Sequence, residues 1–267
     1  MGEFKGKTVF ITGAAKGQGR ETALAFAKEG ANIIGFDLGQ KISYPAYNDS
    51  SSEELIQLKK DVEALGAKAA VFAGDVRNAQ DVQRAVNGGV EEFGTVDVLF
   101  NNAGICAYGL AHELEESEWD AMIDINLKGA WIAAKYVIPF LIKQKSGVII
   151  NNSSIAGLRG MGRLSHYAAS KWGMVGLTKS WALELAEYNV RVISIHPTGV
   201  NTPLNDGLAF LEGTTPQAIA ERSAGNLLPV PWIEPSDVAE AVLFLSSDRS
   251  RYVTGIQYVL DAGLLTR

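Results

Sequence analysis

Tyr167 and Lys171 stand four positions apart in the stretch SHYAASKWG (165–173), which otherwise carries mainly small side chains. On a helix, residues at i and i+4 share one face, so the phenol and the ammonium project together. A phenol ordinarily titrates at about pH 10. A neighbouring ammonium would stabilise the phenolate and lower that pKa. The pair is therefore a candidate proton-transfer site.

A glycine-rich loop, TGAAKGQG (12–19), joins a short apolar run to a stretch with helical spacing. Glycines let the backbone turn sharply and approach a pyrophosphate, whose charge is favoured by the N-terminus of the following helix. Asp37 ends the next apolar run, where its carboxylate could accept hydrogen bonds from adenosine ribose hydroxyls and would repel a 2′-phosphate. This pattern favours NAD over NADP, although Lys16 favours a phosphate mildly. The structural alternative is that Asp37 caps a turn.

Seven short apolar runs, each followed by Gly, Asn or Asp and then by a helical pattern, organise the chain. Continuous apolar runs suit strands buried on both faces, and strands alternating with helices imply parallel βαβ units. The sequence therefore predicts a single α/β domain with a doubly wound seven-stranded parallel sheet and helices on both faces. The predicted strands lie at 8–13, 32–37, 69–75, 96–104, 147–154, 190–197 and 255–263.

Two segments interrupt this alternation. Residues 38–53 are polar and contain proline and serines, which indicates a surface insertion, and Ser51 or Ser52 is expected to cap the helix that follows. Residues 198–235 mix turn residues with isolated apolar ones over a span too long for an ordinary connection. They are expected to form an irregular substrate-binding loop.

The composition limits the partners. The 267 residues are 47% hydrophobic with a formal net charge of −6, so no basic excess favours nucleic acid or an anionic membrane, and the expected partner is a small molecule. Cys106 is the only cysteine, and the three histidines show no ligand spacing, so no metal is predicted. No run of residues reads as a signal peptide or a membrane span, and we expect a cytoplasmic protein.

Taken together, the motifs resemble those of the short-chain dehydrogenase/reductase family. TGAAKGQG is similar to its cofactor loop, NNAG (101–104) to its fourth-strand motif, and YAASK (167–171) to its Tyr-x-x-x-Lys signature. HPTGVNTP (196–203) resembles the family's Pro-Gly motif, with Thr198 where glycine is usual. The insertion, HPTGVNTP and the ending DAGLLTR resemble the carveol-dehydrogenase-like branch, of the mycofactocin-coupled type.

The resemblance implies a Rossmann fold and an NAD-dependent alcohol dehydrogenase or carbonyl reductase. Tyr167 is implied to exchange the substrate hydroxyl proton, Lys171 to tune Tyr167 and bind the nicotinamide ribose, and Ser154, rather than the neighbouring Ser153, to bind the substrate oxygen. Asn126 is implied to hold a water in the proton path; its structural alternative is a polar residue that distorts a helix. The expected cofactor contacts are Thr12, Gly13, Lys16, Gly17, Gln18, Gly19, Asp37, Asp75, Val76, Asn102, Ala103, Gly104, Tyr167, Lys171, Pro197, Val200 and Thr202.

The substrate is expected to be an alicyclic, terpenoid or steroid-like alcohol, because the residues expected around it are mainly apolar. They are Ile155, Leu158, Met161, Leu204, Leu208, Phe210 and Leu211. One alternative is reduction of 3-oxoacyl thioesters, against which the lack of a basic docking patch argues mildly. The other is a dinucleotide-binding regulator without catalysis, against which the complete catalytic set argues.

The resemblance also makes the helix that carries Trp172 and Trp181 a subunit interface, so a homo-oligomer, specifically a homotetramer, is expected. Some members of the branch are thought to hold their cofactor without free exchange and to pass electrons to a peptide-derived redox partner. We hypothesise that the insertion covers the cofactor. Adjacent helical residues diverge by about 100°, so His166 is not expected on the face of Tyr167. Cys106 and His196 are expected to pack, and His112 to be solvated.

Overall fold

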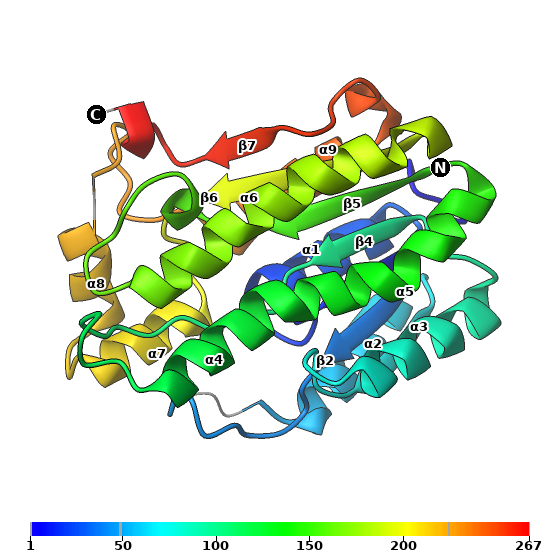
Figure 1. Cartoon of the computed structure of the whole chain (residues 1–267). Helices are drawn as coiled ribbons and strands as arrows, with labels where there is room; N and C mark the ends of the chain where they lie inside the picture. The colour runs from blue at the N-terminus through cyan, green and yellow to red at the C-terminus, as the bar shows by residue number, and fades with distance from the viewer. Residues whose placement is uncertain (1, 48–49, 224, 267) are drawn as a thin grey trace.

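Within residues 2–47, 50–223 and 225–266, which the computed structural model describes, seven parallel strands form one sheet (Figure 1). The predicted doubly wound fold is confirmed. The predicted strands at 69–75, 96–104 and 147–154 extend past the observed ends, because their last residues form loops at the carboxyl edge. The order across the sheet is β3 (Ala69–Ala73), β2 (Asn32–Asp37), β1 (Thr8–Thr12), β4 (Val98–Asn101), β5 (Gly147–Asn152), β6 (Val190–Pro197) and β7 (Gln257–Leu260).

Helices cover both faces of the sheet, and alternate side chains of each strand feed two separate cores. On β1, Val9 and Ile11 join the core beneath α1 (Gly17–Lys28), α2 (Ser52–Ala64) and α9 (Pro235–Ser246). Phe10 points the other way and joins the core beneath α3 (Ala79–Phe93), α5 (Gly129–Gln144) and α6 (Ser165–Leu185). The central strands are thereby fixed from both sides.

The insertion ends where the sequence predicted a cap. Ser51 precedes α2, and its backbone N–H donates to the Glu54 carboxylate at 3.1 Å as one half of a capping box. The preceding residues cross the lower side of the molecule in Figure 1 as an extended segment without a helix or strand in its described part. Residues 48–49 of the predicted insertion lie outside the described residues.

The expectation of an irregular loop at 198–235 is wrong. The segment contains α7 (Pro203–Leu211) and α8 (Pro216–Ser223), and residue 224 lies outside the described residues. Each helix begins at a proline, which suits the first helical turn because it lacks only an N–H that would have no partner there. The prolines that suggested turns are therefore helix starts. Thr198, at the departure from the family motif, does not adopt a left-handed backbone and donates to the Asn226 side chain at 3.1 Å.

One continuous helix reaches the length and apolarity of a membrane span. It runs over 29 residues, Glu116–Gln144, through α4 (Glu116–Ile123), a π-helical turn (Asp124–Lys128) and α5. Half of its most apolar window is buried in the fold, where α5 packs against α3 and the strands β4 and β5. This burial is typical of a core helix that packs on a sheet.

Candidate active site

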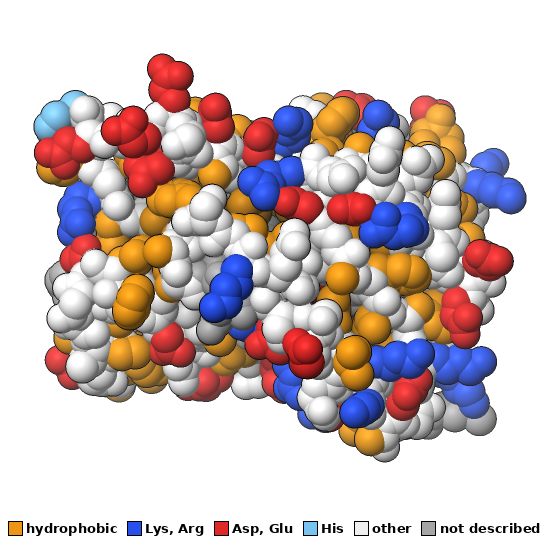
Figure 2. Space-filling model, turned by 90° about the horizontal axis from the view of Figure 1, so that it is seen from below, with side chains coloured by type: hydrophobic (Ala, Val, Ile, Leu, Met, Phe, Trp, Pro, Cys, Tyr) orange, Lys and Arg blue, Asp and Glu red, His pale blue; other side chains and the backbone are white. Residues whose placement is uncertain are grey.

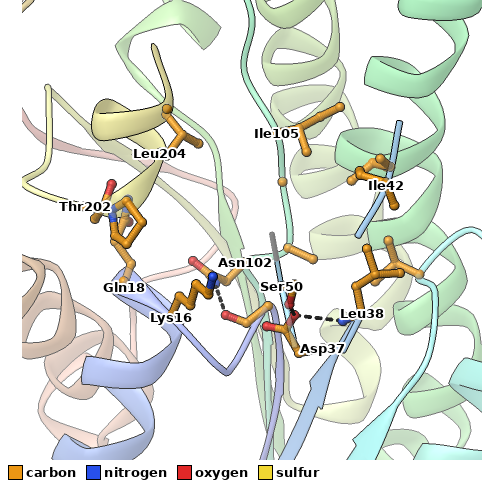
Figure 3. Close-up of a pocket in the computed structure, with 18 of the residues that line it drawn as sticks. Lys16, Gln18, Asp37, Leu38, Ile42, Ser50, Asn102, Ile105, Thr202 and Leu204 are labelled. Atoms are coloured by element: carbon orange, nitrogen blue, oxygen red, sulfur yellow. Dashed lines mark hydrogen bonds between the residues drawn. The ribbon is translucent and has the colours of Figure 1, made fainter. Parts of the chain in front are cut away.

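A cavity of about 660 Å³ opens at the carboxyl ends of β1, β2 and β4. The strand order reverses between β1 and β4, and crevices at such switch points are the usual ligand sites of open α/β sheets. Figure 3 shows Leu204 of α7 and the adjoining Thr202 on one side of the cavity, and Leu38 and Ile42 of the insertion on the other. Asn102 lies between them.

The glycine-rich loop lines the cavity at the N-terminus of α1. Gly13 and Gly17 have φ of 65° and 51°, a left-handed conformation that side chains disfavour. A Cβ on Gly19 would lie 2.0 Å from the carbonyl oxygen of Gly13, so the helix starts directly against the loop. The free N–H groups of this helix N-terminus are suited to a pyrophosphate. Lys16 pairs with Glu54 at 2.9 Å, which offsets the positive charge that favoured a phosphate there.

Thr12 and Asn102 brace the loop against β4. The Thr12 hydroxyl accepts the backbone N–H groups of Asn102 at 3.0 Å and Ala103 at 3.1 Å. The Asn102 amide donates to the carbonyls of Thr12 at 3.1 Å and Gly13 at 3.0 Å. Thr12 therefore acts beneath the cavity rather than on its surface.

Asp37 lies at the end of β2 and lines the cavity. Its carboxylate accepts the N–H groups of Ala15 at 2.9 Å and Leu38 at 2.7 Å, and the Ser50 hydroxyl at 3.1 Å. Burial raises the pKa of Asp37, and the hydrogen bond from Ala15 opposes that rise. The carboxylate thus lies where it could accept hydrogen bonds from an adenosine ribose. It also makes the contacts with the loop backbone that are expected if Asp37 caps a turn.

Tyr167 and Lys171 lie in the first two turns of α6 and line the same cavity. The Lys171 ammonium donates to the Asn152 carbonyl at 2.8 Å and lies 5.5 Å from the centre of the Tyr167 ring. Burial lowers the pKa of Lys171 to about 8. Burial also raises the pKa of Tyr167, against a hydrogen bond from Ser154. Burial thus opposes the lowering that a neighbouring positive charge is expected to give, and the pKa of the phenol beside bound oxidised NAD stays a prediction.

Ser153 and Ser154 have different tasks. The Ser153 hydroxyl donates to the Lys171 carbonyl at 2.9 Å and so anchors α6, whereas the Ser154 hydroxyl bonds the phenol of Tyr167. Ser153 lines the main cavity and Ser154 adjoins it through Tyr167. His196, expected to pack, is fully buried, and its Nδ1 donates to the Ser154 carbonyl at 2.7 Å. Burial lowers the pKa of His196 to about 4, which keeps this contact neutral and fixed.

Asn126 lies in the π-helical turn between α4 and α5, as its helix-distorting alternative suggested. Its side chain clamps the loop after β4: the amide donates to the Ile105 carbonyl at 2.9 Å, and its oxygen accepts the Ile105 N–H at 2.8 Å. The same amide lies 3.2 Å from the Ser170 hydroxyl, one residue from Lys171. Its role toward a water stays a prediction.

The structure brings most of the predicted contacts to one cavity and leaves some aside. Pro197 is the buried end of β6, and Val200 forms a bridge with Ile233, so neither lines the cavity. The predicted cavity residues that do line it are Gly13, Lys16, Gly17, Gln18, Asp37, Asp75, Val76, Asn102, Ala103, Gly104, Tyr167, Lys171, Thr202, Leu204 and Phe210.

The predicted substrate residues separate into two groups. Leu204 and Phe210 line the cavity, whereas Ile155, Leu158, Met161, Leu208 and Leu211 do not. Met161 and Leu208 pack with Leu204 and Tyr167 in an apolar cluster around Leu164 and Cys106. Burial raises the pKa of Cys106 to about 12, which leaves an inert thiol that packs, as expected. His112 is exposed, and His166 is buried away from the cavity against Tyr44.

Tyr47 and Gly207 also line the cavity and were not predicted. Tyr47 stands in an insertion whose composition indicated only a surface segment, and Gly207 stands in a segment that was not expected to be helical. Among the described residues, no group of three or more His, Cys, Asp or Glu side chains could hold a metal ion.

Comparison with known proteins places this geometry in a family. The model of the short chain dehydrogenase family matches residues 7–209. The (−)-trans-carveol dehydrogenase of Rhodococcus erythropolis is 42% identical, over 98% of this chain and 99% of that protein. A 3-oxoacyl-[acyl-carrier-protein] reductase of Thermotoga maritima is 38% identical, over 98% of each.

Solved structures agree. The carveol dehydrogenase of Mycobacterium avium, in complex with NAD, is 36% identical and superposes with a TM-score of 0.95 over 100% of both chains. A short chain dehydrogenase of Mycobacterium paratuberculosis, bound to NAD, gives 0.92 at 33% identity over 100% of both chains. The chain belongs to the short-chain dehydrogenase family, and the resemblance carried by its motifs is confirmed. It is an oxidoreductase with the family's doubly wound dinucleotide fold.

Replacement of Asp37 tests how the site distinguishes NAD from NADP. Asp37→Ser removes the carboxylate that would repel a 2′-phosphate, so the ratio of kcat/KM for NAD to that for NADP should fall by about tenfold or more, equivalent to about 1.4 kcal/mol. Asp61→Asn is the control, since Asp61 pairs with Arg20 outside the cavity. An unchanged ratio in Asp37→Ser would mean that the ribose is bound elsewhere.

Lys171 tests the cost of burying an ammonium. The pKa of Lys171 is about 8 in the folded protein, below the ordinary 10.5, so burial of the ammonium lowers the free energy of unfolding. This loss of stability is complete below pH 8 and disappears as the pH rises through 10.5. Lys171→Met should therefore raise the free energy of unfolding by about 2 kcal/mol at pH 7, allowing for the lost bond to Asn152, while activity is lost.

The measurement is urea unfolding of both proteins at pH 7 and pH 10. The gain should shrink at the higher pH. Lys179→Met, on the exposed side of the same helix, should show no pH-dependent difference. A Lys171→Met gain that is equal at both pH values would contradict the assigned cause.

Proposed function

We propose that the protein is an NAD-dependent dehydrogenase that interconverts a secondary alcohol and its ketone, with Tyr167 as the acid or base. One observation carries this proposal: Tyr167 and Lys171 line the same cavity as Asp37 and the glycine-rich loop. A dinucleotide that spans from Asp37 past the N-terminus of α1 would end beside the phenol. The NAD held by the two solved relatives supports the choice of coenzyme.

When bound, NAD supplies the hydride chemistry, and the chain supplies orientation and proton management. His196 holds the Ser154 backbone carbonyl, and the Ser154 hydroxyl bonds the substrate oxygen beside Tyr167. Tyr167 takes the proton of the alcohol or returns it to the ketone. Lys171 bonds the ribose and stabilises the negative charge of the phenolate, and Asn126 holds the loop that borders this path. Asp75, paired with Arg77 at 2.5 Å, and Val76 border the adenine.

The proposed substrate is an alicyclic or terpenoid secondary alcohol. The apolar residues that line the cavity include Ile105, Leu204 and Phe210. Leu164, Leu208, Met161 and Cys106 form an apolar cluster with Leu204 and Tyr167, so uncharged side chains surround this end of the site. A ring compound with one oxygen suits that composition, because a single polar group would meet Ser154 and Tyr167. The carveol dehydrogenase relatives support the same class.

Two alternatives remain to be separated by activity. The Thermotoga maritima relative supports reduction of 3-oxoacyl thioesters. The underside of the molecule carries acidic as well as basic side chains with hydrophobic ones between them (Figure 2), and this mixture argues mildly against a basic docking patch for an acyl-carrier protein. A non-catalytic regulator would need only the coenzyme half of the cavity, whereas here Ser154, Tyr167 and Lys171 are joined as well.

Turnover tests the function directly. Cyclic secondary alcohols, 3-oxoacyl thioesters and NAD or NADH should be screened by absorbance of the reduced coenzyme, and we expect turnover of the alcohols. Tyr167→Phe should lower kcat by roughly 10²- to 10⁴-fold, the usual contribution of a proton-transfer group, with NADH binding unchanged. A variant that keeps most of its activity would contradict the role of Tyr167. Turnover of thioesters alone would favour the first alternative, and no turnover the second.

We also propose a homotetramer in the cytoplasm, with NAD exchange slowed by the insertion. Trp131 of α5 and Trp172 of α6 are about half exposed, at 45% and 51%, and Leu183 of α6 is 83% exposed. Large exposed apolar side chains on neighbouring helices favour a partner. Trp181, in contrast, is buried in the core beneath α6.

The assembly is tested by light scattering. The molar mass should be four times that of the chain, and Leu183→Asp should lower it, because a carboxylate is costly in an apolar interface. Ile56→Asp on α2, where the side chain is 52% exposed, is the control. A tetramer that survives Leu183→Asp would place the interface on another surface.

A further inference from the structure

Gly207 lies at a position where glycine is unfavourable for the local structure. It lies inside α7, and a glycine in a helix interior costs about 1 kcal/mol relative to alanine. A Cβ at this position would stand 2.2 Å from two ring atoms of Tyr47. Only a residue without a side chain allows the ring to lie directly on the helix backbone. The contact joins two segments that are distant in sequence, the insertion and α7.

Tyr47 is held at its other end by the loop after β4. Its hydroxyl donates to the Cys106 carbonyl at 2.8 Å and lies 3.4 Å from the Cys106 N–H, which it can accept. Burial raises the pKa of Tyr47, so the hydroxyl stays protonated and remains a donor. The ring is thus fixed between α7 and the loop that carries Cys106, and it forms part of the cavity wall with Gly207, Phe210 and Tyr167.

The rest of the insertion is tied to the same site. The Tyr44 hydroxyl lies 3.1 Å from Nε2 of the buried His166, next to Tyr167. The Ser50 hydroxyl donates to Asp37 at the coenzyme end. Side-chain contacts on both sides of Tyr47 therefore limit its freedom, and a side chain so restrained can exclude ligand atoms rather than yield to them.

We propose that Tyr47 is a specificity-determining residue of the substrate site, which closes the cavity against α7 at Gly207 and limits the size of the alcohol ring accepted. This proposal rests on the proposed function, because it names the part of that site that selects among cyclic alcohols. Tyr47 acts at the substrate end, since Cys106, whose carbonyl accepts its hydroxyl, packs in one apolar cluster with Tyr167 and Leu204. Leu204 continues the cavity wall, and Leu208 and Leu164 pack in the apolar cluster behind it.

Two substitutions disturb the contact from opposite sides. Tyr47→Ala removes the ring, and Gly207→Ala adds the methyl group that the ring cannot accommodate in place. If Tyr47 limits ring size, both variants should raise kcat/KM for borneol, a bridged bicyclic alcohol, relative to cyclohexanol. We expect about a tenfold change in that ratio, in the range of pocket effects on apolar substrates. Tyr47→Phe keeps the ring and should keep the ratio of the unaltered protein.

The double variant separates a contact from two unrelated effects. Once Tyr47 is alanine, the methyl group of Gly207→Ala has room, so the second substitution should add little. Tyr252→Ala is the matched tyrosine control, since its side chain is 88% exposed and lies outside the cavity. NADH affinity is measured for each variant and should not change.

The outcomes distinguish the two levels of the proposal. An unaltered protein that oxidises none of the cyclic alcohols overturns the proposed function, and the role of Tyr47 with it. An active protein whose Tyr47→Ala variant loses kcat/KM equally for both alcohols overturns only the specificity role and leaves Tyr47 as a packing residue. If Tyr47→Ala changes the kcat/KM ratio but the effects of Tyr47→Ala and Gly207→Ala simply add in the double variant, the contact with Gly207 is not the basis of the selectivity.

Discussion

Desolvation of the Tyr167 and Lys171 pair is the constraint on which the site depends. Both groups are held where burial opposes their charged forms, so a protonated phenol and an ammonium that releases its proton more readily than usual stand side by side. The raised pKa favours the neutral phenol, and the Lys171 ammonium is the positive charge that can oppose this preference when Tyr167 gives up its proton. Two contacts oppose the effect of burial. The hydrogen bond from Ser154 favours the charged form of the phenol, and the Asn152 carbonyl accepts the ammonium of Lys171.

The sheet supplies the rigidity that this arrangement needs. Asp37 ends β2, Asn102 directly follows β4, and Ser154 lies two residues after β5, and these strands are buried on both faces. Short backbone and side-chain hydrogen bonds then lock the loops to one another, as in the brace between Thr12 and Asn102. His196 extends the same principle to β6, because its neutral ring holds the Ser154 backbone from the far side.

Sequence reasoning succeeded where the signal was local or repeated. Strand runs gave the sheet, and the Tyr-x-x-x-Lys spacing gave residues that share a cavity. It failed on contacts made only by the fold. Nothing next to Tyr47 in the chain indicates Gly207, and proline in α7 and α8 suggested turns although each starts a helix. Likewise, the charge next to Tyr167 was visible in the sequence, whereas the burial that raises the pKa of Tyr167 depends on packing.

The π-helical turn at Asp124–Lys128 has a consequence for the long helix that contains it. A π turn widens the helix by one residue and rotates everything that follows relative to what precedes it. The polar side chain of Asn126 can therefore face the active site while α5 keeps an apolar face on the sheet. Deletion of one residue in this turn would restore regular α-helical winding and bring the two faces out of phase, so the length of this segment is constrained independently of its composition.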